Sequence, residues 1–515
     1  MTSSLSGERR HAHNFVFGLI VLIALAVRVP HLTKELAPYQ FCDEGMWLSE
    51  VQRMLSTGSL VPSNFRSGSL SIVPVFLASR VASIFVGRPL TGNQITVIAR
   101  FVLILGSTTG CAFVFRRLCR RLLHSETMVS ICVATLLLNP ASLAFSIYWY
   151  PDHFIMFPAV VFYLVILKAH DDEGFSHRSF GIAGAALAIL LSVKYTTLLA
   201  GVMLLIPLFK GVRPRFKMEN LRPVFWRLFA LAMGTTLMFL VMNYGMIVRP
   251  DRFLTDFKFN FENYGQVQGG MTSFLFYSWS TFVSPLGLLA VGAFLWGIRV
   301  MIRLSGRLTV SLLSFPVLLI LSLSRSGLTV SRHSAVVIPL VVLIFTVGLE
   351  NLVSLLVPRI GKSGLSVAMV TVPMLIAPVV ESGRQVSASL RQDSRVAAAE
   401  WIRANIPATS TIGSNEFCSG ASPADTVGLK TTIDPTLSLH LEYYVLNSYW
   451  ASPLFPHYLD RGNQRYFHFY RINGFGVPLF VNPTSLSDLV PPGYVIAKTI
   501  TLDGPEIVVL KRIST

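Results

Sequence analysis

Two neighbouring acids, Asp43 and Glu44, follow the first apolar segment of the chain. Acidic residues are scarce, with 26 Asp and Glu among 515 residues, so a pair at the edge of an apolar segment needs an explanation. A carboxylate can take a proton from a hydroxyl group, and cationic side chains can stabilise a departing phosphate. The pair is therefore either a solvated loop end or one half of a site that transfers a group from a phosphate-linked donor.

Further charged residues lie at the ends of later apolar runs, namely Asp152, Lys194, Arg325, Arg332 and His333. Each of them also has a simpler explanation. Asp152 follows Pro151 and could cap the next helix. The cationic side chains could extend to lipid headgroups, and His333 could be an ordinary helix-end residue. The chemistry depends on whether the fold brings these residues to one face of a membrane.

The composition is that of a membrane protein. The chain is 52% hydrophobic and 13% charged, with a mean hydropathy of +0.58, and its apolar residues form repeated long runs. These runs do not alternate in polarity, which excludes a transmembrane β-barrel and predicts a polytopic α-helical protein. The net charge of +17 comes from short Lys and Arg clusters between the runs. Anionic lipid and the positive-inside bias explain these clusters, so we expect no nucleic-acid partner.

The basic clusters also predict which helix ends are cytoplasmic. Arg9 and Arg10 place the N-terminus inside, which puts Asp43 and Glu44 outside. The arginines within 116–121 are a strong cytoplasmic signal, so the apolar run 69–86 is predicted to lie on the membrane surface rather than to cross it. Residues 33–94 then form a long first outer loop with amphipathic helices. We predict about eleven spans. They are 15–27, 95–115, 127–147, 154–168, 179–193, 196–209, 226–247, 273–298, 308–323, 334–356 and 365–380.

The composition changes near residue 381, where long apolar runs stop and Pro, Asn, Asp and Ser become common. We therefore divide the chain into a transmembrane domain, 1–380, and a small soluble α/β domain, 381–515, on the outer face. In the latter we predict a helix at 393–405 and short strands at 411–413, 494–497 and 505–510, the last two forming a hairpin. In the former, the polar segment 248–272 is predicted to be an outer loop, either a lid or an ordinary connection.

Several short motifs, in this order and on this face, resemble those of the GT-C membrane glycosyltransferases. The nearest branch is that of the protein O-mannosyltransferases and the lipid A aminoarabinose transferase. The motifs are Cys42-Asp43-Glu44-Gly45, Ala99-Arg100-Phe101, Tyr150-Pro151-Asp152, Val193-Lys194-Tyr195 and Ser331-Arg332-His333. The resemblance covers most of the chain. It implies a GT-C fold, a polyprenyl-phosphate sugar as donor, and a glycan, lipid or protein as acceptor.

The resemblance also implies roles for the charged residues. Asp43 would be the base for the acceptor hydroxyl, with inversion at the sugar carbon, and Glu44 would orient or bind. Asp152 would be a second acid facing the cavity, and Arg100 could pair with an acid there. The donor phosphate would be held by Lys194, Arg332, His333 and Arg325. We expect that no cofactor is required. A divalent cation is compatible with the acids on the outer face, but no metal-ligand spacing in the sequence requires one.

Two departures from the family pattern bear on the substrates. Gly45-Met46-Trp47 follows the acids where family members often carry tyrosines, which leaves the acceptor class open. The Lys-Pro-Pro stretch of the aminoarabinose transferases is also missing from the first outer loop, so we do not assign that particular activity.

Two other classes of function are compatible with this sequence. A transporter or flippase of a lipid-linked sugar would be expected to carry its ionisable groups at mid-bilayer in repeated halves, whereas here they lie at helix ends. A non-catalytic relative that binds a polyprenyl lipid could lose the acids, which are present. We expect an integral protein of a bacterial inner membrane, with a cytoplasmic N-terminus and an outer active site and C-terminal domain.

Overall fold

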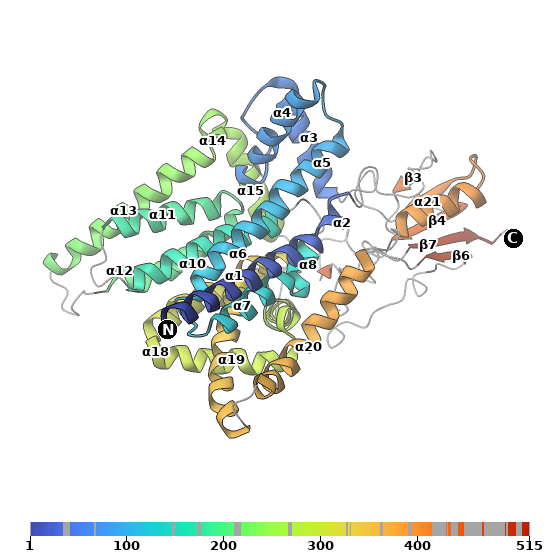
Figure 1. Cartoon of the computed structure of the whole chain (residues 1–515). Helices are drawn as coiled ribbons and strands as arrows, with labels where there is room; N and C mark the ends of the chain where they lie inside the picture. The colour runs from blue at the N-terminus through green and yellow to red at the C-terminus, as the bar shows by residue number, and fades with distance from the viewer. Residues whose placement is uncertain are drawn as a thin grey trace.

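In the computed structural model, most of the chain is helical (Figure 1). The structure describes residues 2–33, 42–65, 68–146, 149, 151–171, 177–210, 218–265, 270–325, 328–329, 331–360, 364–389, 394–414, 429, 431–433, 441–447, 466–467, 490, 493–500 and 507–513. In the first half, the helices are α1 (Thr2–Ala26), α2 (Val29–Leu32), α3 (Cys42–Thr57), η1 (Ser69–Ser71), α4 (Val73–Val86), α5 (Gly92–Arg100), η2 (Phe101–Leu105), α6 (Gly106–Cys119), α7 (Glu126–Leu138), α8 (Pro140–Phe145), α9 (Pro151–Phe154), α10 (Met156–Asp171), α11 (His177–Leu191), η3 (Tyr195–Leu204), α12 (Leu205–Leu208) and α13 (Met218–Met242). The later ones are α14 (Gly245–Val248), α15 (Pro250–Gly265), α16 (Met271–Ser278), η4 (Trp279–Val283), α17 (Ser284–Leu286), α18 (Leu288–Ser324), η5 (Ser331–Val337), α19 (Ile338–Ile360), α20 (Gly364–Ser389) and α21 (Ser394–Asn405).

Within these described ranges, 7 helical stretches are long and apolar enough to cross a membrane. They are His11–Leu32, Ser69–Val86, Gly92–Cys119, Pro151–His170, Arg222–Met242, Leu288–Ser324 and His333–Val357. Shorter apolar helices at Glu126–Leu138, His177–Leu191 and Tyr195–Leu208 match further predicted spans. Ser69–Val86 meets the length and composition of a span, so its place on the membrane surface stays a prediction. The turn predicted between spans 273–298 and 308–323 corresponds to a kink in α18, where Ser305 has non-helical angles.

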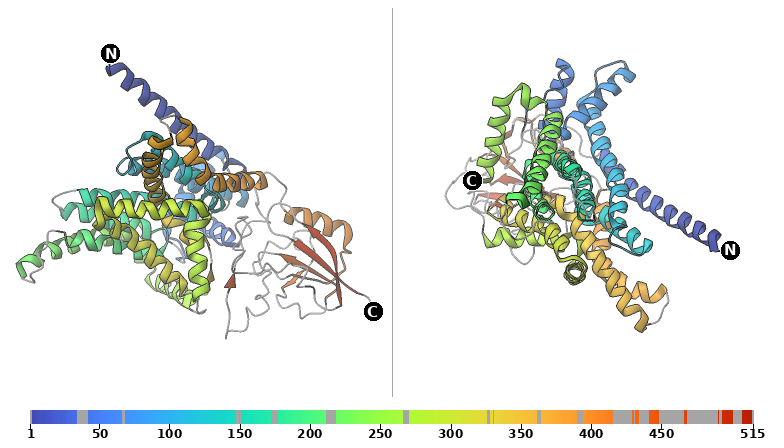
Figure 2. Two further views of the ribbon diagram at one scale, coloured as in Figure 1. Left: turned by 90° about the horizontal axis from the view of Figure 1, so that it is seen from below. Right: turned by 90° about the vertical axis from the view of Figure 1, so that its left-hand side faces the viewer.

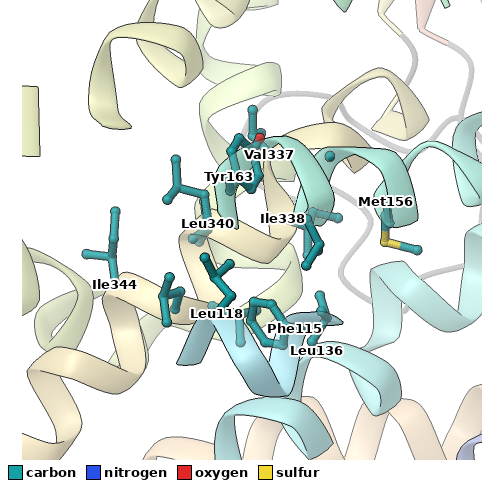
Figure 3. Close-up of a cluster of buried hydrophobic side chains, with 14 of the residues drawn as sticks. Phe115, Leu118, Leu136, Met156, Tyr163, Val337, Ile338, Leu340 and Ile344 are labelled. Carbon is teal, nitrogen blue, oxygen red and sulfur yellow. The ribbon is translucent and has the colours of Figure 1, made fainter. Parts of the chain in front are cut away.

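The core of the helical body surrounds α19 (Figure 3). Its apolar residues point in all directions around the helix, which is typical of a helix without a solvent or lipid face. In its most apolar stretch 78% of the residues are buried, against 6% for α13, so α19 is central and α13 is peripheral. Phe115 and Leu118 of α6, Leu136 of α7 and Tyr163 of α10 pack around it. The hydroxyl of Tyr163 donates to the Val336 carbonyl at 2.8 Å and joins α10 to η5.

Helices α18 and α19 approach each other closely at two glycines. A Cβ atom on Gly297 would lie 2.0 Å from the Ile344 carbonyl oxygen, and one on Gly348 would lie 1.9 Å from that of Ala293. Backbones can approach this closely only where side chains are absent, which is a common way for membrane helices to associate.

Gly297→Ala should therefore lower the free energy of unfolding in detergent by about 2 kcal/mol or more, because the added methyl group meets backbone atoms that cannot move alone. Gly292→Ala is the matched control, since Gly292 lies on the same helix with open space around it. Equal stabilities of the two variants in a denaturant titration would contradict this contact.

Helices α3, α4 and α5 form a separate group at one end of the helical body (Figure 1). They share a small core that contains Trp47, Val51, Phe76, Ile95 and Trp149. Helix α4 exposes an apolar stripe at helical spacing, formed by Leu77, Val81, Ile84 and Phe85. This stripe is compatible with the lipid contact expected for the first outer loop.

Residues 250–265 form α15, which corrects the prediction of a loop at 248–272. Phe253 and Phe257 stack on each other one helical turn apart, and the buried Asp256 accepts a hydrogen bond from the Phe65 backbone N–H at 2.8 Å. The many polar residues on the outward face of this helix hid its periodicity in the sequence. Its action as a lid stays a prediction.

The segment that follows α3, residues 58–65, folds back on that helix through Glu50. Its carboxylate accepts hydrogen bonds from Arg53 at 2.6 Å and from the backbone N–H and hydroxyl of Ser63, both at 2.6 Å. Burial raises the pKa of Glu50, but the hydrogen bonds from Arg53 and Ser63 outweigh it and leave the pKa below its ordinary value of 4.5.

A lowered pKa in the folded state means that the ionised carboxylate stabilises this loop above the ordinary pKa, and that the stabilisation is lost as the pH falls through the lower folded value. Hydrogen-exchange protection factors of residues 58–65 should thus be constant near neutral pH and fall roughly tenfold in acid. In Glu50→Gln they should be low throughout. A parallel acid response in that variant would exclude Glu50 as the cause.

The C-terminal part forms a small α/β unit beside the helical body (Figure 2). Its strands are β2 (Ile412–Ser414), β3 (Thr431–Ile433), β4 (Tyr443–Asn447), β5 (Tyr466–Phe467), β6 (Tyr494–Ile500) and β7 (Ile507–Arg512). A further strand, β1 (Leu328–Thr329), lies between α18 and η5 and pairs in parallel with β5. A five-stranded sheet has the order β3-β2-β4-β7-β6, with β2 parallel to both neighbours and β7 antiparallel to both of its own. The predicted helix at 393–405 and the C-terminal hairpin are confirmed. Helix α20 continues through residue 381, where we divided the chain, to Ser389.

Candidate active site

The acid beside Asp43 forms a buried ion pair. Glu44 lies in the first turn of α3, and both of its oxygens face Arg100 at the end of α5, with N–O distances of 2.9 and 2.7 Å. Neither side chain is exposed to solvent. Arg100 also donates to the His31 carbonyl at 2.8 Å. Of the two alternatives for Arg100, pairing with an acid or extending to lipid headgroups, the structure shows the first, and the same arginine connects α3 to α2.

Asp43 itself is the second residue of α3. Its side chain lies outside the described part of the structure, so the backbone alone places it. A carboxylate in the first turn of a helix is stabilised by the unpaired backbone N–H groups and the positive end of the helix dipole. Because the next residue, Glu44, is anchored by Arg100, the backbone of Asp43 is held in place relative to α5.

Trp149 connects α3 to the segment that carries Asp152. Its backbone N–H donates to Glu44 Oε1 at 2.6 Å, and its indole Nε1 donates to the Ser71 carbonyl at 3.1 Å. The side chain is fully buried. Trp149 thus holds together the first acidic motif, the turn before α4 and the start of α9. Two of the predicted acids, Glu44 and Asp152, therefore belong to one connected structure.

Asp152 and Lys194 form a second ion pair at 2.5 Å. Asp152 lies in the first turn of α9, and Lys194 lies in extended backbone between α11 and η3, with φ −152° and ψ 124°. Their side chains are 6% and 17% exposed, so the pair is mostly but not completely withdrawn from solvent. A partly accessible lysine on a carboxylate can exchange its partner for a phosphate, which is the chemistry expected of a donor site.

The remaining predicted cations lie along the segment that precedes α19. His333 belongs to η5 and is buried, with Nδ1 at 3.5 Å from the Tyr277 hydroxyl. Arg332 precedes it, and its side chain lies outside the described part. Arg325 is an exposed residue directly after α18. Helix η5 packs against α9, so the segment that contains His333 lies beside the one that contains Asp152.

Irregular helix geometry accompanies three of these positions, namely Arg100, Lys194 and His333. A π-helical turn, Phe101–Leu105, follows Arg100 directly, and a 3₁₀ helix begins after Lys194. A second π-helical turn, Trp279–Val283, packs against the 3₁₀ helix Ser331–Val337. Such turns occur frequently at functional sites, and in a membrane they are tolerated where protein or a polar cavity surrounds them.

Sequence analysis missed the residues that join these parts, above all Trp149 and Asn243. Asn243 is a lone amide near the end of the apolar run 226–247. Because buried amides need hydrogen-bond partners, its position in that run could have predicted a contact with another segment. The role of Trp149 could not have been found in this way because an indole beside a membrane interface is common. Among the residues that the structure describes, no three His, Cys, Asp or Glu side chains gather as metal ligands.

Neither a protein-family model nor a curated protein matches the sequence. The fold is nevertheless similar to that of solved structures. One is ArnT from Cupriavidus metallidurans bound to undecaprenyl phosphate, with a TM-score of 0.50, 12% identity and coverage of 96% of this chain and 97% of that chain. Another is the oligosaccharyltransferase AglB from Archaeoglobus fulgidus, in complex with an inhibitory peptide and a dolichol-phosphate, with a TM-score of 0.51, 12% identity and coverage of 85% and 70%.

A further structure of the Archaeoglobus fulgidus oligosaccharyltransferase, tethered to an acceptor peptide, has a TM-score of 0.50 at 12% identity, covering 86% of this chain and 70% of that chain. At this level of identity the similarity concerns the fold. The chain has the fold of the GT-C membrane glycosyltransferases and is an integral membrane protein, which confirms the fold class that the motifs implied.

Proposed function

We propose that the protein is an inverting glycosyltransferase that moves a sugar from a polyprenyl-phosphate donor to a hydroxyl acceptor on the outer face of the membrane. The acceptor is a cell-envelope glycan, a lipid or a protein. The membrane is a bacterial inner membrane, with the N-terminus in the cytoplasm and the C-terminal α/β unit outside. The GT-C fold supports the class of reaction, and the charged residues described above support the location of the active site.

In the proposed reaction, the carboxylate of Asp43 takes the proton of the acceptor hydroxyl. The hydroxyl oxygen forms a bond to the anomeric carbon while the bond from that carbon to the phosphate oxygen breaks. The electron pair leaves with polyprenyl phosphate, and Lys194 and Arg332 stabilise its charge. Attack from the face opposite the leaving group inverts the anomeric centre. His333 and Arg325 are weaker candidates for phosphate contact.

Glu44 takes a positioning role in this proposal. Its carboxylate already accepts hydrogen bonds from Arg100 and from Trp149, so proton transfer through it would first have to break a buried ion pair. Asp152 holds Lys194 in the absence of donor and would release it to the donor phosphate. The two acids of the first motif thereby have different tasks.

The observation that carries the proposal is the link from Glu44 through Trp149 to the Asp152 segment. It joins the first acidic motif to the aspartate of an aspartate–lysine pair, in a fold similar to that of ArnT with undecaprenyl phosphate bound. Trp279 Nε1 and Thr281 Oγ1, in the turn next to η5, are buried and have no hydrogen-bond partner among the residues that the structure describes. Such atoms are costly unless a ligand or water completes them, as a polar sugar would.

The test is a transfer assay with purified full-length protein in nanodiscs. A labelled polyprenyl-phosphate sugar and a panel of hydroxyl acceptors are supplied, with a nucleotide sugar as the alternative donor and EDTA or a divalent cation in parallel reactions. We expect transfer from the lipid-linked donor and not from the nucleotide. Movement of the labelled lipid across the bilayer without transfer would instead favour a flippase, and binding without either would favour a non-catalytic lipid-binding protein.

A further inference from the structure

Lys194 depends on its backbone for its position. It lies with Ser192 and Val193 between the end of α11 at Leu191 and the start of η3 at Tyr195, in extended conformation. Its N–H donates to the Leu190 carbonyl at 3.3 Å and its carbonyl accepts from the Thr197 N–H at 3.2 Å, so both helices contribute to its position. Its long side chain reaches Asp152 only if the backbone at 192–194 is held in place. A lysine side chain has many rotamers, and ordering it costs free energy that the surrounding contacts must supply.

The turn before α4 supplies part of this support. Gly68 N–H donates to the Val193 carbonyl at 3.2 Å, and Leu70 N–H donates to the Ser192 carbonyl at 3.0 Å. These are the two peptide carbonyls immediately before Lys194. The approach requires glycine, because a Cβ atom at position 68 would lie 1.9 Å from the Ser192 carbonyl oxygen. The first outer loop is therefore joined directly to the backbone that carries Lys194.

Asn243, just after α13, joins both sides of this contact with one side chain. Its Oδ1 accepts from Ser69 N–H at 3.1 Å, and its Nδ2 donates to the Ser192 hydroxyl at 2.7 Å and to the Phe239 carbonyl at 3.1 Å. The residue is fully buried. A buried amide with its acceptor and donor both in use sets the distance between the groups it bridges, because leaving either unpaired is costly.

We infer that Asn243 is a positioning residue for phosphate binding by Lys194, acting through a clamp formed by residues 68–70, Ser192 and Asn243. The clamp fixes the Lys194 backbone relative to the first outer loop. Since the Ser71 carbonyl accepts from Trp149, whose N–H binds Glu44, the same turn also contacts the Asp43 helix through that tryptophan. Asn243 thus sets the separation between the proposed base and the proposed phosphate ligand. Only the expected change in KM rests on the proposed function; the contacts that hold Lys194 do not depend on it.

The experiment compares Asn243→Leu with Asn351→Leu in full-length protein. Asn351 is the matched control, an amide in α19 that accepts from Trp296 Nε1 at 2.9 Å and lies outside the proposed site. For Asn243→Leu we expect the KM for the polyprenyl-phosphate sugar to rise roughly tenfold with a smaller change in kcat. Asn243→Asp keeps an acceptor for Ser69 N–H and should recover part of the loss. Asn351→Leu should leave both constants unchanged.

A second readout does not depend on transfer. The rate at which a lysine-acylating reagent labels Lys194, measured by mass spectrometry, should rise several-fold in Asn243→Leu because the amine is no longer held on Asp152. If wild-type protein transfers no sugar but this labelling rises, the clamp stands and the proposed function falls. If KM and labelling stay at wild-type values in a folded Asn243 variant, the clamp is overturned. Should Asn243→Leu not fold, Ser192→Ala removes the same hydrogen bond and carries the same expectations.

Discussion

Replacing Asp43 with asparagine should lower the rate of sugar transfer by ~10²–10⁴-fold while leaving the protein folded. Asparagine has the same shape as aspartate, but its amide cannot take the proton of the acceptor hydroxyl. Because the substitution leaves the cationic residues intact, the KM for the lipid-linked donor should change little. The measurement is the initial rate of transfer from a labelled polyprenyl-phosphate sugar, with thermal unfolding as the check on folding.

Asp251→Asn is the matched control for this prediction. Asp251 lies in the first turn of α15, as Asp43 lies in the first turn of α3, and it is exposed. The same substitution there should leave the transfer rate within about twofold, because changes at exposed side chains usually have small effects. Undiminished transfer by a well-folded Asp43→Asn variant would remove Asp43 as the base, and Asp152 would become the next candidate.

The sequence could identify Asp43-Glu44 because two acids beside an apolar run are rare in a chain of this composition, and because the basic clusters predict which helix ends are cytoplasmic. The residues alone did not separate the two acids, and only the family resemblance assigned Asp43 as the base and Glu44 as the orienting residue. What the structure adds is the set of contacts that Glu44 makes with Arg100, 56 positions further along the chain, and with the backbone N–H of Trp149. A contact between distant segments leaves no local pattern that one sequence can reveal.

The same reason explains what was missed in the fold. Long apolar helices such as α19 were predicted because their composition alone determines their environment. Helix α15 was not, because its buried face consists of a few phenylalanines and Asp256 that contact the first outer loop rather than a continuous apolar neighbour. Periodicity detects burial against a core, whereas this helix is held by specific contacts.

Removing Arg100 should destabilise the protein strongly. Arg100→Met is expected to lower the free energy of unfolding by about 3–5 kcal/mol, because it leaves the Glu44 carboxylate buried without its partner. Both side chains are fully buried, so water cannot replace the lost hydrogen bonds without opening the structure. The measurement is denaturant unfolding of the detergent-solubilised protein, in parallel with the transfer assay.

Two comparisons make this prediction specific. Arg120→Met breaks a pair with Glu126 whose side chains are 46% and 34% exposed, and it should cost about 1 kcal/mol or less. The double variant Glu44→Gln with Arg100→Met should recover part of the stability lost in Arg100→Met, because no buried charge remains. A loss in Arg100→Met no larger than in Arg120→Met would show that the buried pair is not what anchors α3.

The double variant also separates folding from catalysis. If Glu44 acts by positioning, restoring stability without restoring the ion pair should leave transfer impaired, because α3 loses its direct anchor to α5 and its bond to Trp149 is weakened. The free energy of unfolding would then approach that of the wild type while kcat/KM would not. Recovery of both together would mean that any neutral packing at positions 44 and 100 is sufficient, and that the orientation of Asp43 is set by other contacts of α3.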